Sequence, residues 1–488
     1  MMNQELTHLY PSKLWEIFGN ICAIPHPSKH EEKILSWLID WAKANNVDYS
    51  QDKTGNIVFR KPATPGFENR VPVIMQGHID MVPQANNDST HNFFTDPIIP
   101  VIGDDGWLRA SGTTLGADNG IGVATGMAIM VSNDLQHGPI EVLITVDEET
   151  GMTGAFGIQP DFLKGEILLN LDTEDEGEIF VGCAGGLDAT IEFNYNIVDI
   201  PANMTGYNFA LTGLKGGHSG MDIHLGRGNA IKVMARFFKK AINEFGVRIS
   251  NIDGGSLRNA IPREAFVIFA VPKDKVSVFE SYVEKFTAII MSELSATEPN
   301  MCLKVTPCET PKEVIGTVCQ KNILNVVLAI PNGVMRMSDS MPGLVETSTN
   351  LATVKTVQGT VKMGSLLRSS VDTAKEALGE KMVAIAELLG VSCELANGYA
   401  GWKPNLESPI LKTMINVYEN KFGVKPKINA IHAGLECGLF SQVYPHWDMI
   451  SCGPTIRSPH SPDERVNIAS VGKFFDFIVE TLKNVPVK

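Results

Sequence analysis

Four apolar segments in the first 175 residues of the chain constrain its fold most strongly. They are residues 55–61, 71–80, 139–149 and 166–175, and the last three end in polar or acidic residues. Near-continuous apolar segments of this length are typical of strands that are buried on both faces, and helical segments alternate with them. The sequence therefore predicts an α/β fold, with a mixed, largely parallel sheet that carries helices on both faces.

The segment that precedes these strands predicts a helix with a defined start. Ser28 has the side chain of an N-cap residue, Glu31 follows three positions later, and apolar residues then recur at helical spacing. This pattern predicts a capping box, in which the two side chains bind the first free amides of the helix. Further helices are expected at 228–245, 275–296, 408–422 and 469–483.

The pattern of apolar and polar residues changes near residue 187, and the earlier pattern returns near residue 400. Between these points the strands alternate apolar and polar residues, as half-exposed strands do. We therefore expect a discontinuous main domain, residues 1–186 and 401–488, that carries an inserted α+β domain, residues 187–400. A strand–strand–helix grouping at 344–390 repeats an earlier one, which is compatible with two tandem α+β units.

Charge and cysteine usage narrow the class of protein. The formal net charge of −14 argues against a nucleic-acid or anionic-membrane partner, because either requires a basic face. The eight cysteines form no C-x-x-C pair, and no 18-residue apolar segment or signal-peptide pattern is present. The sequence predicts a cytoplasmic protein with reduced thiols and a small-molecule partner.

Several ionisable residues stand where strands of the main domain end or in Gly-rich turns beside them. They are His78, Asp80, Asp118, Glu148, Glu149, Asp172 and His460. Strand ends gather at one edge of an α/β sheet, where clustered carboxylates repel one another unless a cation compensates them. Two histidines with three acidic groups form a ligand set suited to zinc, cobalt or manganese. One shared carboxylate could bridge two ions about 3.5–4 Å apart, and Asp118 in its Gly-flanked turn is the best candidate.

Each motif also has a structural interpretation when it is taken alone. "HID" at 78–80 can be a hydrogen-bonded pair, since residues i and i+2 share a face if the strand continues. "DEE" at 147–149 can be a solvated turn, and His460 can lie in a plain surface loop. "GADNGIG" at 116–122 can be a helix start, and a phosphate loop is disfavoured because no G-K-[ST] follows. Together the motifs favour a metal site.

Five motifs, in order, resemble a known enzyme family. "GHIDMVP", "LGADNGIG", "TVDEETG", "NLDTED" and "SPHSPDE" are similar to those of the dizinc metallopeptidases that include aminoacylase, carboxypeptidase-like enzymes and cytosolic di- and tripeptidases. The resemblance covers essentially the whole chain. "KGGHSGMDIH", "SLRNAIPRE", "LLRSS" and "IHAGLECG" point to a dipeptidase branch of this family.

The resemblance implies a role for each residue of the main-domain set. His78 and Asp172 would bind one ion, Glu149 and His460 the other, and Asp118 would bridge them. Asp80 would orient His78 as a hydrogen-bond acceptor, and Glu148 would be the general base for a bridging water. The family also leads us to expect a cis peptide bond after Asp118. Zinc is the family default, with cobalt or manganese as alternatives.

The resemblance makes the inserted domain a lid over the active site. His218 would stabilise the oxyanion, while Asn259 and Arg368 would bind the substrate's carbonyl and terminal carboxylate. Glu436 could meet the substrate's amino group. His224 and His432 have no counterpart in the resemblance, and we interpret them as structural or peripheral.

The activity that the resemblance implies is hydrolysis of short unblocked dipeptides, especially dipeptides with a C-terminal histidine, including β-alanyl-histidine. The alternatives are an N-acyl-amino-acid deacylase or carboxypeptidase of the same fold, a non-catalytic binding protein, and a nucleotide-binding protein that uses "GADNGIG". A homodimer is expected, and whether His218 acts within its own chain stays open.

Overall fold

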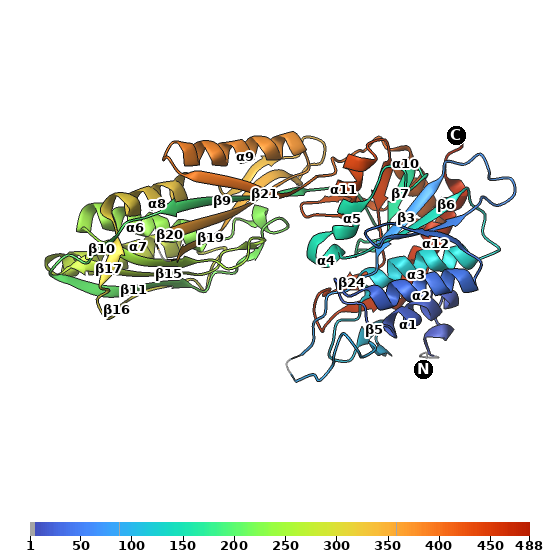
Figure 1. Cartoon of the computed structure of the whole chain (residues 1–488), viewed down its shortest axis with the longest axis horizontal. Helices are drawn as coiled ribbons and strands as arrows, with labels where there is room; N and C mark the ends of the chain where they lie inside the picture. The colour runs from blue at the N-terminus through green and yellow to red at the C-terminus, as the bar shows by residue number, and fades with distance from the viewer. Residues whose placement is uncertain (1–4, 87, 358) are drawn as a thin grey trace. The chain divides into compact units, whose positions relative to one another are not determined.

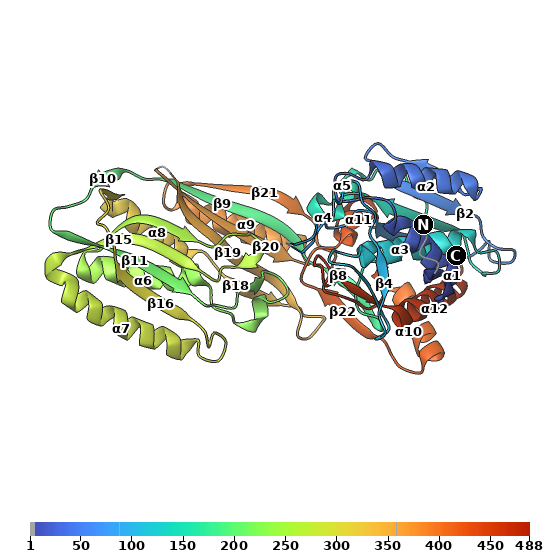
Figure 2. The same ribbon diagram turned by 90° about the horizontal axis from the view of Figure 1, so that it is seen from below.

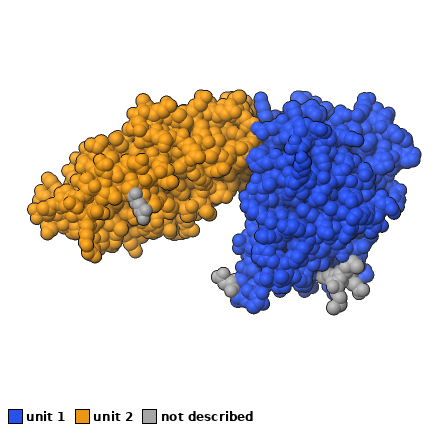
Figure 3. Space-filling view, in the orientation of Figure 1, with its two compact units in different colours: residues 1–183, 402–430, 435–488 blue, residues 184–401, 431–434 orange. Residues whose placement is uncertain are grey.

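The computed structural model describes residues 5–86, 88–357 and 359–488, which form two compact units (Figure 3). Unit 1 comprises residues 1–183, 402–430 and 435–488, and unit 2 comprises residues 184–401 and 431–434. The chain passes from unit 1 to unit 2 after Cys183 and returns to unit 1 after Gly401. Both positions lie within three residues of the boundaries expected from the sequence. The short segment 431–434 lies in unit 2, although it falls within the expected main domain, residues 401–488.

An eight-stranded sheet forms the centre of unit 1 (Figure 1). Its strands, in spatial order, are β1 (Asp48–Gln51), β2 (Ile57–Lys61), β6 (Ile140–Thr145), β3 (Val73–His78), β7 (Ile167–Asn170), β23 (Asp448–Ser451), β8 (Glu178–Cys183) and β22 (Lys427–Ile431). The four central strands, β6, β3, β7 and β23, run parallel, whereas β1, β2 and β8 pair antiparallel with their neighbours. The predicted mixed α/β sheet is confirmed.

Helices cover this sheet because its central strands carry apolar side chains on both faces. All residues of β3 and β6 are buried. Helix α3 (Ala117–Val131) packs on β3 and β6, and both α1 (Ser12–Cys22) and α12 (Ile468–Asn484) pack against α3. The remaining helices of the unit are α2 (Glu32–Ala44), α4 (Glu148–Gly151), α5 (Thr153–Gly157), α10 (Pro409–Phe422) and α11 (Glu436–Val443). In the described part of the chain, no helix is long and apolar enough to cross a bilayer.

A smaller sheet holds the loop that carries His460. It consists of β24 (Ile456–Arg457), β25 (Arg465–Asn467), β5 (Trp107–Ala110) and β4 (Pro100–Ile102), all antiparallel. The pairing of β24 with β25 makes residues 458–464 a closed loop, so both ends of this loop are fixed.

One nine-stranded antiparallel sheet runs through unit 2 (Figure 2). Its strands are β9 (Gly185–Asn194), β11 (Met204–Thr212), β13 (Arg248–Gly254), β15 (Ala265–Pro272), β16 (Cys302–Pro307), β18 (Gly333–Met337), β19 (Val345–Val357), β20 (Thr360–Ser369) and β21 (Ser392–Tyr399). The two α+β groups expected from the sequence therefore share a single sheet.

Alternating burial along the strands of unit 2 shows where its core lies. Strand β15 places Val267 and Phe269 in the core and leaves Phe266 and Ile268 exposed. Helix α6 (Ala230–Phe245) packs on β15, β11 and β13, and α9 (Asp372–Glu387) packs on β9, β20 and β21. Helices α7 (Val276–Glu293) and α8 (Thr317–Ala329) complete this layer. The sheet thus has one face covered by helices, as an α+β unit requires.

Candidate metal centre

Neighbouring parallel strands deliver the predicted ligands to one edge of the unit 1 sheet. His78 is the last residue of β3, Glu149 follows the end of β6 in α4, and Asp172 lies two residues beyond β7. Asp118 lies in a non-helical kink at the start of α3, and the Asp118–Asn119 peptide bond is cis, as predicted. His460 comes from the loop between β24 and β25. The carboxyl-end edge of a parallel sheet is where such groups converge.

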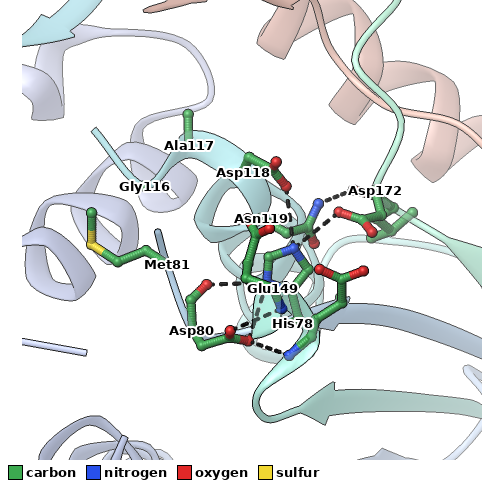
Figure 4. A network of polar contacts seen from close by, with 12 residues as sticks. His78, Asp80, Met81, Gly116, Ala117, Asp118, Asn119, Glu149 and Asp172 are labelled. Atoms are coloured by element: carbon green, nitrogen blue, oxygen red, sulfur yellow. Dashed lines mark hydrogen bonds and ion pairs between the residues drawn. The ribbon is translucent and has the colours of Figure 1, made fainter. Parts of the chain in front are cut away.

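The two oxygens of the Asp118 carboxylate face two different histidines. Figure 4 shows Asp118, His78 and Asp172 within one network of polar contacts. Oδ1 lies 3.2 Å from Nε2 of His78, and Oδ2 lies 3.3 Å from Nε2 of His460. The same His78 nitrogen lies 3.3 Å from Asp172 Oδ1, and the His460 nitrogen lies 3.0 Å from Glu149 Oε1. The five side chains therefore divide into two sets that share Asp118.

Hydrogen bonding on the far side of the His78 ring determines which nitrogen faces the carboxylates. Nδ1 lies 3.0 Å from the backbone oxygen of Asp80, so it carries the proton in the neutral ring. The lone pair of Nε2 then points at oxygens of Asp118 and Asp172. This arrangement is repulsive unless a proton or a cation lies between the three atoms.

The donor set fits divalent metal ions. One imidazole nitrogen and carboxylate oxygens of Asp118 and Glu149 lie within 4.8 Å of one another. Among the described residues, the buried oxygens Glu149 Oε1 and Asp172 Oδ1 have no possible donor other than the imidazole nitrogens of His460 and His78, at 3.0 and 3.3 Å, which leaves them available as ligands. Two histidines with three carboxylates match the preferences of zinc, cobalt and manganese.

Protonation in the metal-free protein reflects the crowding of these carboxylates. Burial is the largest effect on Asp172 and raises its pKa to about 7, with Asp118 and Glu149 adding to the rise. Hydrogen bonds to Asp118 and Glu149 raise the pKa of His460 to about 11. Burial alone would lower the pKa of His78, but the surrounding carboxylates outweigh it and raise that pKa well above 6.5. Protons thus supply the positive charge that metal ions would supply.

Asp80 contacts the neighbouring turn as well as His78. Strand β3 ends at His78, so the expected strand that continues through Asp80 is not formed. The Asp80 carboxylate lies 3.4 Å from His78 Nδ1 and accepts hydrogen bonds from the backbone amides of Glu148 at 2.9 Å and Glu149 at 3.2 Å. Asp80 therefore connects the histidine to the turn that carries both glutamates.

Glu148 occupies an environment that favours its protonated form. Burial is the main cause, and the carboxylates of Asp172 and Glu149 add to it, so that the pKa of Glu148 lies well above 4.5. His78 acts in the opposite direction. A carboxylate with a raised pKa is a stronger base than an ordinary surface glutamate.

The predicted capping box is wrong, because its two side chains make tertiary contacts instead. Helix α2 begins at Glu32, and its N-cap residue Glu31 makes no side-chain cap. Ser28 Oγ donates to Asp80 Oδ2 at 2.7 Å, and Glu31 Oε1 accepts from the amide of Asp147 at 3.0 Å. Both residues support the Asp80–Glu148 region, and no local pattern indicates partners so distant in the sequence.

Unit 2 brings the three predicted lid residues together. His218 in β12 (Gly217–His218) pairs with Ala260 in β14 (Ala260–Ile261), directly after Asn259, which is exposed. His218 Nε2 lies 3.5 Å from Nη2 of Arg368. Arg368 also donates to the hydroxyl of Tyr399 at 3.0 Å.

The protonation of His218 is defined by its surroundings. Burial and the Arg368 guanidinium lower its pKa to about 4, so the ring is neutral at neutral pH. Its Nδ1 accepts the backbone amides of Gly220 and Met221 at 3.2 and 3.0 Å. The single ring proton is therefore on Nε2, which makes that atom a hydrogen-bond donor.

Glu436 lies beneath the ligands rather than at an opening. It is fully buried, and its Oε2 accepts hydrogen bonds from Gln76 at 2.5 Å and Thr145 at 2.9 Å. Burial raises its pKa to about 8. These interior contacts do not favour the expected contact between Glu436 and a substrate amino group. His432 is also buried, with Nε2 2.7 Å from Ser348 Oγ, which agrees with a structural role.

The chain is similar in sequence and in structure to known peptidases. Residues 74–484 match the model of peptidase family M20/M25/M40. The cytosol non-specific dipeptidase of Escherichia coli is 46% identical over 484 residues, which cover 99% of this chain and 100% of that protein. The crystal structure of an aminoacylhistidine dipeptidase from Vibrio alginolyticus is 46% identical, with a TM-score of 0.92, and the match covers 100% of this chain and 99% of that chain.

A more distant structure shares the fold alone. A tripeptidase from Staphylococcus aureus is 16% identical, with a TM-score of 0.56 over 98% of this chain and 99% of that chain. The resemblance to a metallopeptidase family that the sequence motifs indicate is confirmed. The chain belongs to peptidase family M20/M25/M40.

Proposed function

We propose that this protein is a dinuclear metallo-dipeptidase that hydrolyses short unblocked dipeptides, with a preference for a C-terminal histidine as in β-alanyl-histidine. The observation that carries the proposal is the position of Asp118, whose two oxygens face His78 and His460 separately. The names of the two relatives at 46% identity, both dipeptidases, support the substrate class.

In this proposal His78 and Asp172 would hold one divalent ion, Glu149 and His460 would hold the other, and Asp118 would be shared between them. Zinc is the proposed metal, with cobalt or manganese able to replace it. When bound, such a pair of ions polarises the scissile carbonyl and lowers the pKa of a water molecule. The half-exposed side chain of His460, at 52% accessibility, leaves this side of the site open to solvent.

Glu148 is the proposed general base. Its carboxylate takes a proton from the attacking water and later gives it to the nitrogen of the leaving amine, so the base is restored after each turnover. The burial that raises its pKa in the metal-free protein favours the protonated form, which must persist until the C–N bond breaks. Asp80 acts as a positioning residue, holding the His78 ring and the amide of Glu148.

Three residues of unit 2 are proposed to complete the site as a lid. The Nε2–H of His218 is a donor suited to the developing oxyanion, and the tautomer argued above supports this role. Arg368 would bind the terminal carboxylate of the dipeptide, and Asn259 its carbonyl oxygen. Glu436 is left out of the substrate contacts because it is fully buried.

A panel of substrates tests the proposal against its closest alternative, an N-acyl-amino-acid deacylase or carboxypeptidase. The protein, loaded with zinc, should hydrolyse β-alanyl-histidine and other Xaa-His dipeptides with free amino groups. N-acetylated dipeptides should react much more slowly. A higher kcat/KM for the acetylated compounds would favour the alternative.

The proposed assembly is a cytoplasmic homodimer, and a mixing experiment tests whether His218 acts across chains. If it does, His218→Ala and Glu148→Ala subunits, each inactive alone, should regain activity after refolding together, because one site of the mixed dimer is intact. If His218 acts within its own chain, the mixture stays inactive. Light scattering establishes the assembly state.

A further inference from the structure

A buried carboxylate from the His460 loop binds the backbone of the loop that carries Asp118. Glu464 is 2% exposed and stands directly before β25. Its Oε2 accepts hydrogen bonds from the backbone amides of Leu115 at 2.7 Å and Gly116 at 3.1 Å. Its Oε1 accepts the amides of Ala117 at 2.8 Å and Asp118 at 3.3 Å. One side chain thus satisfies four consecutive backbone donors.

These amides need an acceptor from elsewhere in the chain. Leu115 directly precedes the N-cap of α3, and Gly116, Ala117 and Asp118 lie at its start, where the first N–H groups of a helix have no partner within the helix. The N-cap residue, Gly116, has no side chain and adopts a left-handed conformation with φ of 72°. Glu464 supplies the missing cap, and its negative charge also suits the positive end of the α3 dipole.

The contact connects the loops of two proposed ligands. Glu464 follows His460 by four positions, in a turn closed by the hydrogen bond from its own amide to Ser461 O at 2.9 Å. The last amide that it binds belongs to Asp118 itself. Both carboxylate oxygens are occupied by amides, so Glu464 is suited to fix the backbone and is not itself a ligand.

We propose that Glu464 is a positioning residue that holds Asp118 against His460 and thereby sets the affinity for the metal ion that these two residues share. The inference rests on the proposed two-metal function. It differs from the role of Asp80, which acts on His78 and on the Glu148 turn. Each of the two proposed histidine ligands thus has a carboxylate close to it in the sequence, Asp80 for His78 and Glu464 for His460. Each carboxylate accepts hydrogen bonds from the backbone of another part of the site.

A matched control lies in the eight-stranded sheet, at the end of β6 opposite to the proposed ligands. Glu141, near the start of β6, is also buried, and its Oε2 accepts the amides of Lys164 at 2.7 Å and Gly165 at 2.8 Å. Glu141→Gln therefore tests what a buried, amide-binding carboxylate contributes to the fold away from the ligands. Glu464→Gln keeps the shape of the side chain but turns an NH₂ group towards backbone donors.

The test is zinc titration of the metal-free proteins by calorimetry, with hydrogen exchange of the peptide that contains residues 115–118. Glu464→Gln should weaken one of the two zinc-binding steps about 10–100-fold, the range typical for the loss of an outer partner of a ligand. Exchange of the 115–118 amides should be faster before zinc is added. Glu141→Gln should leave both zinc constants within about threefold of the wild type.

Glu464→Asp covers the case in which Glu464→Gln does not fold. It keeps the charge but is one methylene shorter, so it should show a smaller loss of zinc affinity in the same step. Zinc constants for a folded Glu464 variant that equal those of Glu141→Gln would overturn the inference while the two-metal proposal stands. A wild-type protein that binds no zinc would instead remove the proposed function.

Discussion

Asp80 Oδ1 accepts a hydrogen bond from the backbone amide of Glu148 at 2.9 Å, so the residue that orients a proposed ligand also holds the proposed base. Ser28 donates to the other oxygen of Asp80 at 2.7 Å. Removing this carboxylate should therefore disturb the proposed metal ligand His78 and the proposed base Glu148 together.

Asp80→Ala should lower kcat/KM about 10–100-fold or more, with weaker metal binding, because the His78 ring and the Glu148 turn both lose an acceptor. Steady-state kinetics at several zinc concentrations measures the effect. Added zinc should restore occupancy but only part of the rate, since the Glu148 amide stays unbound. Full recovery of the rate at high zinc would show that Asp80 acts on the ligand alone.

Glu148→Gln should lower kcat about 10²–10⁴-fold with little change in KM or zinc content, because the amide cannot accept the proton. Kinetics and elemental analysis of the same sample separate the two effects. Glu16→Gln, which changes a surface residue paired with Lys13, is the control and should retain the wild-type rate. A loss of less than tenfold would argue against Glu148 as the base.

Asp118→Asn should reduce the zinc content below two ions per chain, because a neutral amide is a poor bridge between two cations. Elemental analysis after gel filtration gives the stoichiometry. The control is Asp105→Asn, at an exposed residue paired with Arg109, which should still bind two ions. Retention of both ions by Asp118→Asn would contradict the bridging role.

Glu436 should make the metal-free protein less stable as the pH rises. Burial raises its pKa from 4.5 to about 8 in the folded state, so the folded protein binds one more proton than the unfolded chain between these values. Its contribution to the free energy of unfolding is complete below pH 4.5 and is lost as the pH rises through about 8. Urea denaturation of the wild type and Glu436→Gln at pH 6 and pH 9 checks this. The variant should lose less stability over that interval, and an equal loss would contradict the prediction.

The sequence indicated most of the proposed ligands because they follow an apolar strand or lie in a Gly-rich turn. His78, Asp118 and Asp172 all carry this local signal, and the topology of the parallel sheet then requires them to meet. The motif resemblance added roles that strand ends alone cannot specify. The structure places the proposed main-domain ligands together, whereas the catalytic roles stay proposals.

The supporting contacts could not be predicted in the same way. Ser28 and Glu31 carry a local helix-cap pattern, but their partners are Asp80 and Asp147, far along the chain. Glu464 carried a weak signal, an acidic residue four positions after His460, and its partners are backbone amides that any sequence could provide. Tertiary contacts of this kind leave no periodicity or spacing to detect.

The most direct test of the central claim is zinc content measured together with β-alanyl-histidine hydrolysis, before and after chelation. The two sets of side chains that share Asp118 predict two ions per chain, loss of activity when the ions are removed, and recovery when zinc is restored. Full activity with fewer than one ion per chain would contradict the account.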